Sequence, residues 1–234
     1  MAVIYQRKQG GTLYEVRQAG ASVRLYSNGV LHSQFNPQNT ISGAIWDLLI
    51  LPAFMLPKPP ESALILGLGG GTLVHLIQQF FPQCKITCVE IDPTHIHIAK
   101  RFFKVKGINI VKSDAYGFLK QNTDKFDWII DDVFDHTSGD PVRQHGLVQK
   151  LYQSRLNKNG LLSINVIDDV EGLAGISKEF SRTYRFQHPL YDNQIYVFGN
   201  HLNNVKTFYA GLRQHKCLNQ NYKTCRLKFD LSRL

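Results

Sequence analysis

Residues 62–92 read SALILGLGGGTLVHLIQQFFPQCKITCVEID, and this stretch decides the fold. The apolar run Ala63–Leu66 leads into a glycine-rich turn and then into a helical pattern over Thr72–Phe81, which Pro82 ends. Lys85–Glu90 follows as a second apolar strand. A strand, a tight turn, a helix and a strand in this order predict a βαβ unit with parallel strands.

The same alternation continues downstream of residue 92. Further apolar runs predict strands at Ile108–Val111, Phe126–Asp131, Leu161–Val166, Tyr184–His188 and Gln194–Phe198. Amphipathic runs predict helices at Pro93–Lys104, Ala115–Lys120, Val142–Leu156 and Val170–Phe180. The last two strands have no helix between them and are expected to pair as an antiparallel hairpin. We therefore predict an α/β fold with a doubly wound, mostly parallel seven-stranded sheet and an antiparallel end.

The first forty residues have a different pattern, typical of a small β-structure. Polar and apolar residues alternate over Thr12–Arg17, Ala21–Tyr26 and Val30–Gln34, which predicts three strands. Asn28-Gly29 lies between the second and the third of them. This pair favours the type I′ turn of a hairpin, because both of its residues accept a positive φ. The N-terminal segment is therefore expected to form a β-hairpin appendage.

A helical run over Ile41–Leu51 is expected to end at Pro52, and a proline-rich linker separates it from the first core strand. We divide the chain into three parts on these grounds. They are a β-hairpin appendage at 1–40, a ligand-binding α/β domain at 41–200, and a basic C-terminal helix and tail at 201–234.

Composition limits the classes of protein that fit. Of 234 residues, 43% are hydrophobic and 19% are charged, which allows a sizeable core and excludes wholesale disorder. The sequence has neither an apolar run long enough to span a bilayer nor an N-terminal secretory pattern, so we expect a cytoplasmic protein with no membrane partner. The four cysteines lack the spacing of zinc ligands, and Cys84 and Cys88, in a strand-like run, are expected to be buried reduced thiols.

Positive charge is concentrated at the C-terminus. The formal net charge is +9, and residues 202–234 hold seven Lys and Arg against one Asp. Such a segment could bind RNA, an acidic protein or an anionic subunit. It carries no nucleic-acid-binding motif, so a solvated helix and tail is the interpretation that we prefer.

Four glycines, Gly67, Gly69, Gly70 and Gly71, crowd the turn after the first core strand. They allow a sharp turn and let a ligand approach the backbone at the positive end of the following helix. Thr72 stands where the dinucleotide fingerprint G-x-G-x-x-G has its third glycine. The loop therefore indicates a nucleoside ligand but disfavours a nicotinamide dinucleotide.

Carboxylates stand at the ends of successive strands. Glu90 closes the strand after the glycine loop and could accept both hydroxyls of an adenosine ribose. Asp114 follows the next strand and could accept the adenine amino group. With Asp131 and Asp132 on a further strand, these acids are expected to form one crevice at the carboxyl edge of the sheet, where open α/β sheets bind ligands. Such a crevice would repel a diphosphate and attract a cationic sulfonium or an amine.

Asp132 is the candidate catalytic base. In alkyl transfer to an amine, a carboxylate within hydrogen-bond reach can orient the ammonium group and take its proton. Asp135 would hold a second positive charge on the acceptor. A divalent-metal site made of Asp131, Asp135 and His136 is an alternative that chemistry permits. We expect no metal, because the sequence indicates neither a second cluster nor a phosphate substrate.

Other polar residues near these acids are expected to be structural. Asp92 precedes Pro93 at the start of a helix and should cap it. His95 and His97 are two residues apart on that helix and point to different faces, so they do not form a metal-binding pair. His75 has no partner at helical spacing and is expected to pack or to lie at the surface.

These motifs resemble those of the polyamine aminopropyltransferases, the spermidine synthases and their relatives in the class I S-adenosylmethionine-dependent methyltransferase fold. The resemblance rests on Gly67–Thr72, Val89–Asp92, Ser113–Ala115 and Asp132–Asp135, and extends from Val30 to about Phe198. It implies a Rossmann-like methyltransferase fold and a homodimer. It also implies that Glu90 binds the ribose, Asp114 the adenine, and that Asp132 is the base. Tyr191, in a segment similar to one that lines the amine pocket, would contact the acceptor with Asp135.

The chain also departs from that family. Spermidine synthases carry a glycine-loop aspartate that binds the amino group of decarboxylated S-adenosylmethionine, and Gly70 stands at that position. His32 stands where a donor-binding glutamine is expected, and Gly43–Asp47 replaces a Tyr-Gln-Glu stretch. Loss of the aspartate removes a charge that would repel the carboxylate of intact S-adenosylmethionine. Both S-adenosylmethionine and its decarboxylated form are therefore candidate co-substrates.

We accordingly expect a transferase that moves an aminopropyl or methyl group from an S-adenosyl sulfonium donor to a small amine or a protein amine. A methyltransferase of a protein or small molecule, with no polyamine activity, is the close alternative. An NAD-dependent oxidoreductase and a non-catalytic binding module are more remote. Thr72 and the additional strand-end acids argue against the oxidoreductase.

Overall fold

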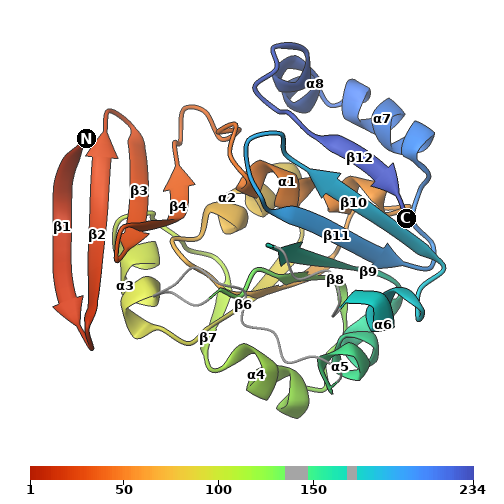
Figure 1. The fold of residues 1–234 in the computed structure, drawn as a ribbon, viewed down its shortest axis with the longest axis horizontal. Coiled ribbons are helices and arrows are strands. Elements are labelled where there is room, and N and C mark those ends of the chain that lie inside the picture. The colour runs from red at the N-terminus through yellow and green to blue at the C-terminus, as the bar shows by residue number, and fades with distance from the viewer. Residues whose placement is uncertain (135–146, 168–172) are drawn as a thin grey trace.

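The structure is a computed structural model that describes residues 1–134, 147–167 and 173–234 (Figure 1). Within these ranges the chain forms a four-stranded N-terminal sheet and an eight-stranded central sheet. The elements, in chain order, are β1 (Ala2–Gln9), β2 (Thr12–Ala19), β3 (Ser22–Ser27), β4 (Val30–Phe35), α1 (Trp46–Ile50), the 3₁₀ helix η1 (Leu51–Met55), β5 (Ser62–Leu66), α2 (Thr72–Phe80), β6 (Lys85–Glu90), α3 (Pro93–Arg101), β7 (Asn109–Lys112), α4 (Ala115–Gln121), β8 (Phe126–Asp131), α5 (Leu147–Arg155), β9 (Leu156–Val166), α6 (Ala174–Ser177), β10 (Arg182–Gln187), β11 (Gln194–Gly199), α7 (Val205–Gln214), α8 (Lys216–Lys223) and β12 (Asp230–Arg233).

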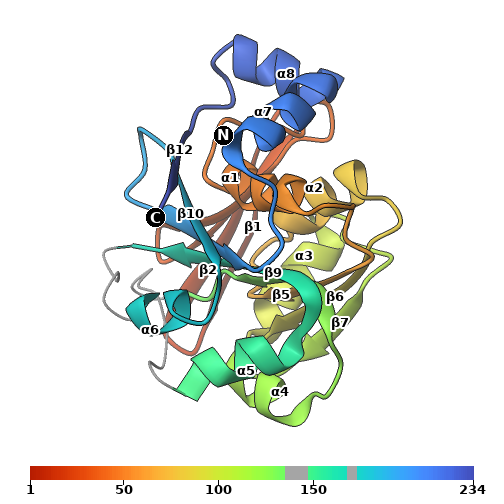
Figure 2. The ribbon, with the colours of Figure 1, turned by 90° about the vertical axis from the view of Figure 1, so that its right-hand side faces the viewer.

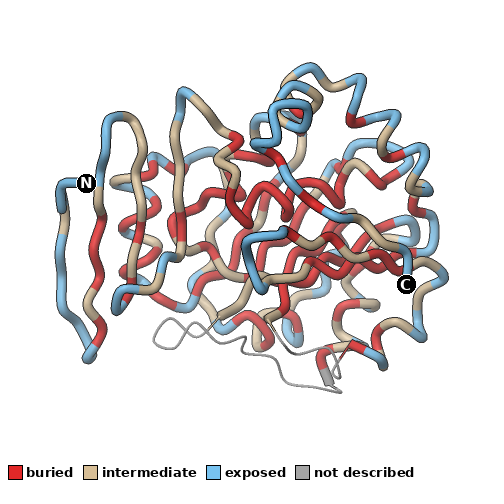
Figure 3. Tube along the Cα trace, turned by 45° about the horizontal axis from the view of Figure 1, so that its top comes forward, coloured by how far each residue is buried: buried red, intermediate tan, exposed pale blue. Residues whose placement is uncertain are grey.

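The N-terminal sheet is an antiparallel meander in the order β1-β2-β3-β4. Its last turn is the predicted one, and Asn28 and Gly29 have φ values of +47° and +84°. Strand β1 is not among the strands predicted from the sequence. It is exposed along most of its length, whereas the inner strand β2 is largely buried (Figure 3). The meander stands beside the central domain and contacts it through α3 and the glycine loop (Figure 1).

The central sheet has the order β12-β10-β11-β9-β8-β5-β6-β7. Strands β5 to β9 are parallel, and β11, β10 and β12 add an antiparallel end. The chain runs outward from β5 to β6 and β7, then returns to β8 on the other side of β5. The carboxyl ends of β5 and β8 therefore flank the point where the strand order reverses, which is where such sheets bind ligands. The predicted doubly wound fold is confirmed, with β12 as an eighth strand.

Helices cover both faces of the central sheet (Figure 2). Successive strand residues alternate between two hydrophobic clusters, so that Ile65 of β5 packs with α1, α2 and α3 while its neighbour Leu64 packs with α4, α5 and α6. Strands buried on both faces read as continuous apolar runs. This is why the sequence reveals them so clearly.

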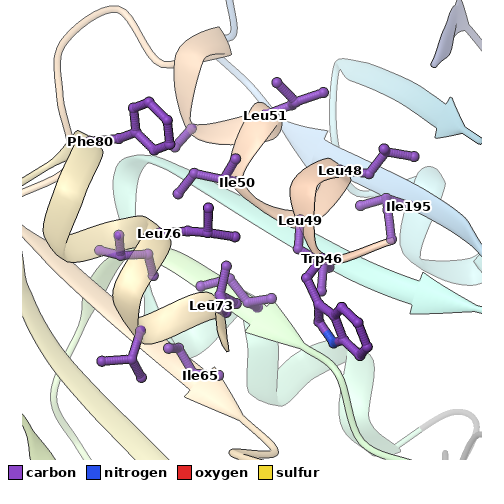
Figure 4. Close-up of a cluster of buried hydrophobic side chains, with 14 of the residues drawn as sticks. Trp46, Leu48, Leu49, Ile50, Leu51, Ile65, Leu73, Leu76, Phe80 and Ile195 are labelled. Atoms are coloured by element: carbon purple, nitrogen blue, oxygen red, sulfur yellow. The ribbon is translucent and has the colours of Figure 1, made fainter. Parts of the chain in front are cut away.

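One cluster holds the glycine loop in place. Leu49 and Ile50 of α1 lie against Leu73 and Leu76 of α2, next to strand β5 (Figure 4). All four side chains are almost completely buried, and each contributes about 1.5–3 kcal/mol of apolar burial. Because the glycine loop joins β5 to α2, this packing fixes both of its ends.

The helix expected over Ile41–Leu51 is shorter and shifted. α1 begins at Trp46, and the chain continues beyond Pro52 as the 3₁₀ helix η1, because proline is tolerated in the first turn of a new helix. The residues before Trp46 are not helical, since Gly43 has φ +82° and the Asp47 carboxylate accepts the backbone N–H groups of Ser42 and Gly43. Other boundaries differ as well: α3 ends at Arg101, three residues early, β9 begins at Leu156, five residues early, and the helix expected over Val170–Phe180 ends at Ser177. The beginnings of this helix and of the one expected over Val142–Leu156 lie outside the described residues.

Residues 201–234 form more structure than one helix and a tail. Two helices, α7 and α8, are followed by β12, which pairs antiparallel with β10 at the edge of the central sheet. All four cysteines are free thiols; Cys88 is buried as predicted, whereas Cys84 is only half-buried. Within the part of the chain that the structure describes, no helix is long and apolar enough to cross a bilayer.

Asp47 is a deeply buried acid in α1 and gives a testable pH dependence. Its side chain is 1% exposed, and burial raises the pKa of Asp47 to about 6, against the opposing effect of hydrogen bonds from Gly43 and Ser42. Because the folded protein binds this proton more tightly than the unfolded chain does, protonation stabilises the fold. That contribution is fully present below pH 4 and is lost as the pH rises through about 6.

We therefore expect the free energy of unfolding of the wild type, relative to Asp47→Asn, to fall by up to about 3 kcal/mol between pH 4 and pH 7. Urea denaturation of both proteins at several pH values measures this difference. Asp124→Asn, at an exposed loop acid, is the control and should show no such trend. A difference that is flat or that rises with pH would contradict the assignment.

Candidate active site

A cavity of about 320 Å³ opens at the carboxyl edge of the parallel strands. It brings together most of the predicted site residues, namely Gly67, Gly69, Gly71, Glu90, Asp114, Asp132 and Tyr191. Apolar side chains, including Trp46, Phe134 and Ile167, complete much of the wall. Charges in such a partly apolar cavity interact more strongly than they would in water.

The glycine loop has the backbone that its sequence predicts. Gly67, Gly69 and Gly71 have φ values of +92°, +51° and +88°. A Cβ atom at Gly67 would lie 2.5 Å from the carbonyl oxygen of Asp132, so the loop and the end of β8 approach as closely as only glycine permits. This contact draws the loop and the candidate base to the same side of the cavity.

Strand β4 holds the loop from outside. The Gly70 N–H donates to Ser33 Oγ at 2.6 Å, and Thr72 Oγ1 accepts from the Gln34 N–H and donates to the Gln34 carbonyl at 3.2 and 3.0 Å. Gly70 does not line the cavity: a Cβ atom there would lie 2.7 Å from the Phe103 ring and 2.8 Å from Ser33 Cβ. Thr72 therefore links the loop to the N-terminal sheet, and position 70 has no room for a side chain.

Glu90 is buried beneath the loop and lines the cavity. Its Oε2 accepts the N–H groups of Leu68 and Gly69 at 2.9 and 3.3 Å, and its Oε1 accepts the Asp92 N–H at 2.8 Å. Burial raises the pKa of Glu90, and these three backbone hydrogen bonds oppose the rise by stabilising the charged form. The carboxylate is thus held in one orientation at the predicted ribose position. The ribose contact itself stays a prediction.

Asp114 lies at the rim of the cavity and has a structural role as well. It is the N-cap of α4, where its Oδ1 accepts the Gly117 N–H at 2.6 Å. The side chain is exposed and lines the cavity. The cap fixes the carboxylate at the strand end, and its predicted contact with adenine stays a prediction.

Asp131 and Asp132 point in opposite directions, as neighbours at a strand end do. Asp131 is fully buried on the α4–α5 face, where its Oδ2 accepts the hydroxyls of Tyr116 and Tyr152. It does not line the cavity. The expectation that both acids share the crevice is therefore wrong for Asp131, because strand alternation turns its side chain to the other face.

Asp132 lines the cavity, and a chain of two amides reaches its carboxylate. Asn165 Nδ2 donates to Asp132 Oδ1 at 2.7 Å, and Asn193 Nδ2 donates to Asn165 Oδ1 at 3.0 Å. Neither asparagine is among the site residues predicted from the sequence. Asn165 could have been predicted as a site residue, because it stands near the carboxyl end of the predicted strand Leu161–Val166, which is part of β9 and pairs with β8.

Tyr191 lies in the loop between β10 and β11 and faces the cavity. It is 37% exposed, and its ring packs edge-on against His188 with centroids 4.8 Å apart. Its predicted contact with the acceptor stays a prediction. Asp135 and His136 lie outside the described residues, so neither the predicted second acceptor contact nor the alternative metal site is tested. Among residues 1–134, 147–167 and 173–234, no cluster of three or more His, Cys, Asp or Glu could hold a metal.

The residues expected to be structural have structural partners. Asp92 caps α3 by accepting the Thr94 N–H at 2.7 Å, as predicted, and also accepts the Tyr14 hydroxyl at 2.7 Å. Burial and the neighbouring Asp92 raise the pKa of Tyr14 to about 12. His75 stacks on Phe35 with centroids 3.8 Å apart. These contacts join the N-terminal sheet to the helices behind the glycine loop.

The chain is a doubly wound α/β protein with an acid-lined cavity at the carboxyl edge of its sheet, and comparison with known proteins identifies its family. Residues 47–168, just over half of the chain, match the model of the spermine/spermidine synthase domain. The chain therefore belongs to the spermine/spermidine synthase family. A probable polyamine aminopropyl transferase of Bifidobacterium longum is 28% identical over 144 residues, which are 61% of this chain and 32% of that protein.

Solved structures support the fold. A probable spermidine synthase from Corynebacterium glutamicum has a TM-score of 0.70 and 20% identity, over 85% of this chain and 81% of that one. A spermidine synthase in complex with the transition state analogue AdoDATO has a TM-score of 0.66 and 20% identity, over 88% and 76%. The predicted spermidine-synthase-like fold is confirmed. The matched segments span only 32% to 41% of the length of the first curated relatives, so the activity of this chain is taken up as a proposal.

Proposed function

We propose that this protein is a transferase that binds an S-adenosyl sulfonium donor in the cavity and transfers its alkyl group to an amine. The observation that carries the proposal is the convergence of Glu90, Asp114 and Asp132 on one cavity beside the glycine loop. Carboxylates from three strand ends create a negative potential that attracts a sulfonium cation and an amine. Membership of a family with relatives named aminopropyltransferases agrees with this chemistry.

In the proposed binding mode, Glu90 accepts the ribose hydroxyls and Asp114 contacts the adenine at the rim. The glycine loop passes close to the donor without a Cβ atom in the way. Asp132 then lies on the acceptor side of the cavity, with Tyr191 as the aromatic contact for the acceptor. Asp135 completes the acceptor contacts in this proposal.

The proposed reaction is an in-line displacement. The amine nitrogen attacks the carbon bound to the sulfonium, the carbon–nitrogen bond forms as the carbon–sulfur bond breaks, and a neutral thioether leaves. Asp132 accepts the proton that the amine gives up. The positive sulfur is already a good leaving group, so catalysis depends mainly on positioning the two reactants and on one proton acceptor.

A second candidate donor is favoured by one specific observation. The space beside Gly70 is filled by Phe103 and Ser33, so the loop presents no acid to a donor amino group at the position where the resembling enzymes carry aspartate. This favours intact S-adenosylmethionine, whose carboxylate such an acid would repel, and with it the transfer of a methyl group. The aminopropyl and methyl versions of the proposal share the cavity and the base.

Isothermal titration calorimetry tests the proposal with methylthioadenosine, S-adenosylhomocysteine, S-adenosylmethionine and its decarboxylated form. We expect the adenosyl thioethers and at least one sulfonium to bind, and NADH, as a control, not to bind. The preference between the two sulfonium donors distinguishes methyl from aminopropyl transfer. Failure of all four ligands to bind would contradict the proposal, and salt-sensitive binding of RNA alone would favour a non-catalytic module.

A further inference from the structure

We infer that Asn165 and Asn193 are positioning residues that hold the Asp132 carboxylate ionised and correctly oriented for proton transfer. Asn165 acts on the carboxylate directly, and Asn193 acts through Asn165. The inference deepens the proposed function, because it rests on Asp132 being the proton acceptor of that reaction. Both asparagines line the cavity, but this role requires no contact with the donor.

The direction of the hydrogen bonds follows from chemistry. An ionised carboxylate only accepts, so Asn165 must present its NH₂ group to Asp132 Oδ1, 2.7 Å away. Its carbonyl oxygen then faces Asn193, which must in turn present its own NH₂ group, 3.0 Å away. One orientation of Asn193 therefore fixes one orientation of Asn165, and this favours the charged form of Asp132.

The two amides are held by different segments, Asn165 by strand β9 and Asn193 by the β10–β11 loop. Asn165 is 3% exposed and stands in β9, paired with Ile195 of β11, so its backbone is fixed by the strand ladder. Asn193 lies just before β11, in the same loop that carries Tyr191. The loop that is proposed to contact the acceptor thus also determines the orientation of the base.

Strands β8 and β9, near whose carboxyl ends the Asn165–Asp132 pair lies, offer a matched control at their opposite ends. Asn157 at the start of β9 donates through Nδ2 to Asp127 Oδ1 near the start of β8, also at 2.7 Å. This pair has the same chemistry and the same length as the Asn165–Asp132 pair. It does not line the cavity, so Asn157→Ala controls for the loss of an equivalent hydrogen bond between β8 and β9.

Other titratable groups share the cavity with Asp132 or interact with it, and they must stay constant in the test. Among the described residues, the cavity is also lined by His32, Glu90, His95, Asp114 and Tyr191, and Cys88 interacts electrostatically with Asp132. Neither Asn165→Ala nor Asn193→Ala changes any of these groups or adds a charge. A change in the titration of Asp132 therefore reports on the amide chain.

The experiment compares the wild type, Asn165→Ala, Asn193→Ala, the double variant and Asn157→Ala. The carboxyl carbon of Asp132 is followed by ¹³C NMR against pH, with its signal assigned by its loss in Asp132→Asn. We expect its titration midpoint to rise by about one pH unit in Asn165→Ala and by less in Asn193→Ala. In Asn157→Ala the midpoint should not move.

Turnover supplies the second measurement. We expect about a tenfold loss in Asn165→Ala and about a threefold loss in Asn193→Ala, with the acid limb of the pH profile displaced upward and donor affinity unchanged. Because Asn193 acts through Asn165, the double variant should equal Asn165→Ala rather than show the product of the two losses.

An unmoved midpoint in Asn165→Ala, an equal shift in Asn157→Ala, or multiplying losses in the double variant would overturn the inference. If Asn165→Ala fails to fold, Asn193→Ala, at a half-buried loop position, still tests the chain through its own midpoint. The midpoints do not depend on activity. If the proposed function is wrong, calorimetry will show no donor binding. If only this inference is wrong, the NMR titration midpoints will show it.

Discussion

Replacing Asp132 with asparagine is expected to lower turnover at least about a hundredfold while leaving donor affinity unchanged. Asparagine has the same shape as aspartate and can still accept the Asn165 hydrogen bond through its carbonyl oxygen. The backbone contact of residue 132 with the Leu66 carbonyl, which holds the end of β8 to β5, does not involve the side chain. What the variant loses is the group that accepts the proton of the amine.

The measurement is turnover with a saturating donor, together with calorimetric titration of the same donor. Asp192→Asn removes an exposed acid next to Tyr191 and controls for a general change in charge near the site. It should retain nearly full turnover. Unchanged turnover in Asp132→Asn would show that the proton goes to another group.

Glu90→Gln is expected to weaken donor binding by about a hundredfold. The Glu90 carboxylate accepts three backbone N–H groups and, in the proposed binding mode, the two ribose hydroxyls. Glutamine has only one carbonyl oxygen, so its NH₂ group must face either the glycine loop or the Asp92 N–H, which are donors themselves. Hydrogen bonds to a charged partner contribute about 1.5–3 kcal/mol each, so losing one or two corresponds to this factor.

Calorimetry with S-adenosylhomocysteine measures the effect on the adenosyl part alone. Glu61→Gln, just before β5 at the opposite edge of the sheet, removes an exposed acid paired with Lys58 and should leave affinity unchanged. Circular dichroism of Glu90→Gln checks that the fold persists. Wild-type affinity in a folded Glu90→Gln protein would remove Glu90 from the ligand site.

The sequence predicts the core of the fold well because local and tertiary signals agree there. β6 and β8 have the predicted bounds, and the turn that joins β5 to α2 has the positive φ values that its glycines indicate. Strands covered on both faces must be apolar throughout, so their limits are easily seen. The position of Glu90 in the cavity follows from the same regularity.

The parts that the sequence does not reveal depend on contacts between distant segments. β12 forms only because β10 offers it an edge, and nothing in Asp230–Arg233 alone indicates a strand. α1 is shortened because Asp47 binds the backbone before it. Thr72 is interpreted as a departure from a dinucleotide motif, whereas its role in the structure is to hold β4.

In the candidate site, too, some residues are predicted correctly from the sequence and others are not. Asp131 and Asp132 are predicted to lie together because they end the same strand, but side chains alternate along a strand, so Asp131 lies on the opposite face, between two tyrosines. The amide chain of Asn165 and Asn193 joins residues 28 positions apart, and only the pairing of β9 with β11 brings them together. A strand-end acid can be recognised as a candidate site residue from the sequence, whereas the role of these asparagines follows only from their hydrogen-bond partners in the structure.

A crystal structure of the protein with bound methylthioadenosine tests the central claim most directly. We expect the ribose hydroxyls within hydrogen-bond distance of the Glu90 carboxylate, the adenine at Asp114, and the thioether sulfur directed into the cavity toward Asp132. A nucleoside bound elsewhere, or one in this cavity with its ribose away from Glu90, would contradict the assignment of these strand-end acids to a sulfonium nucleoside.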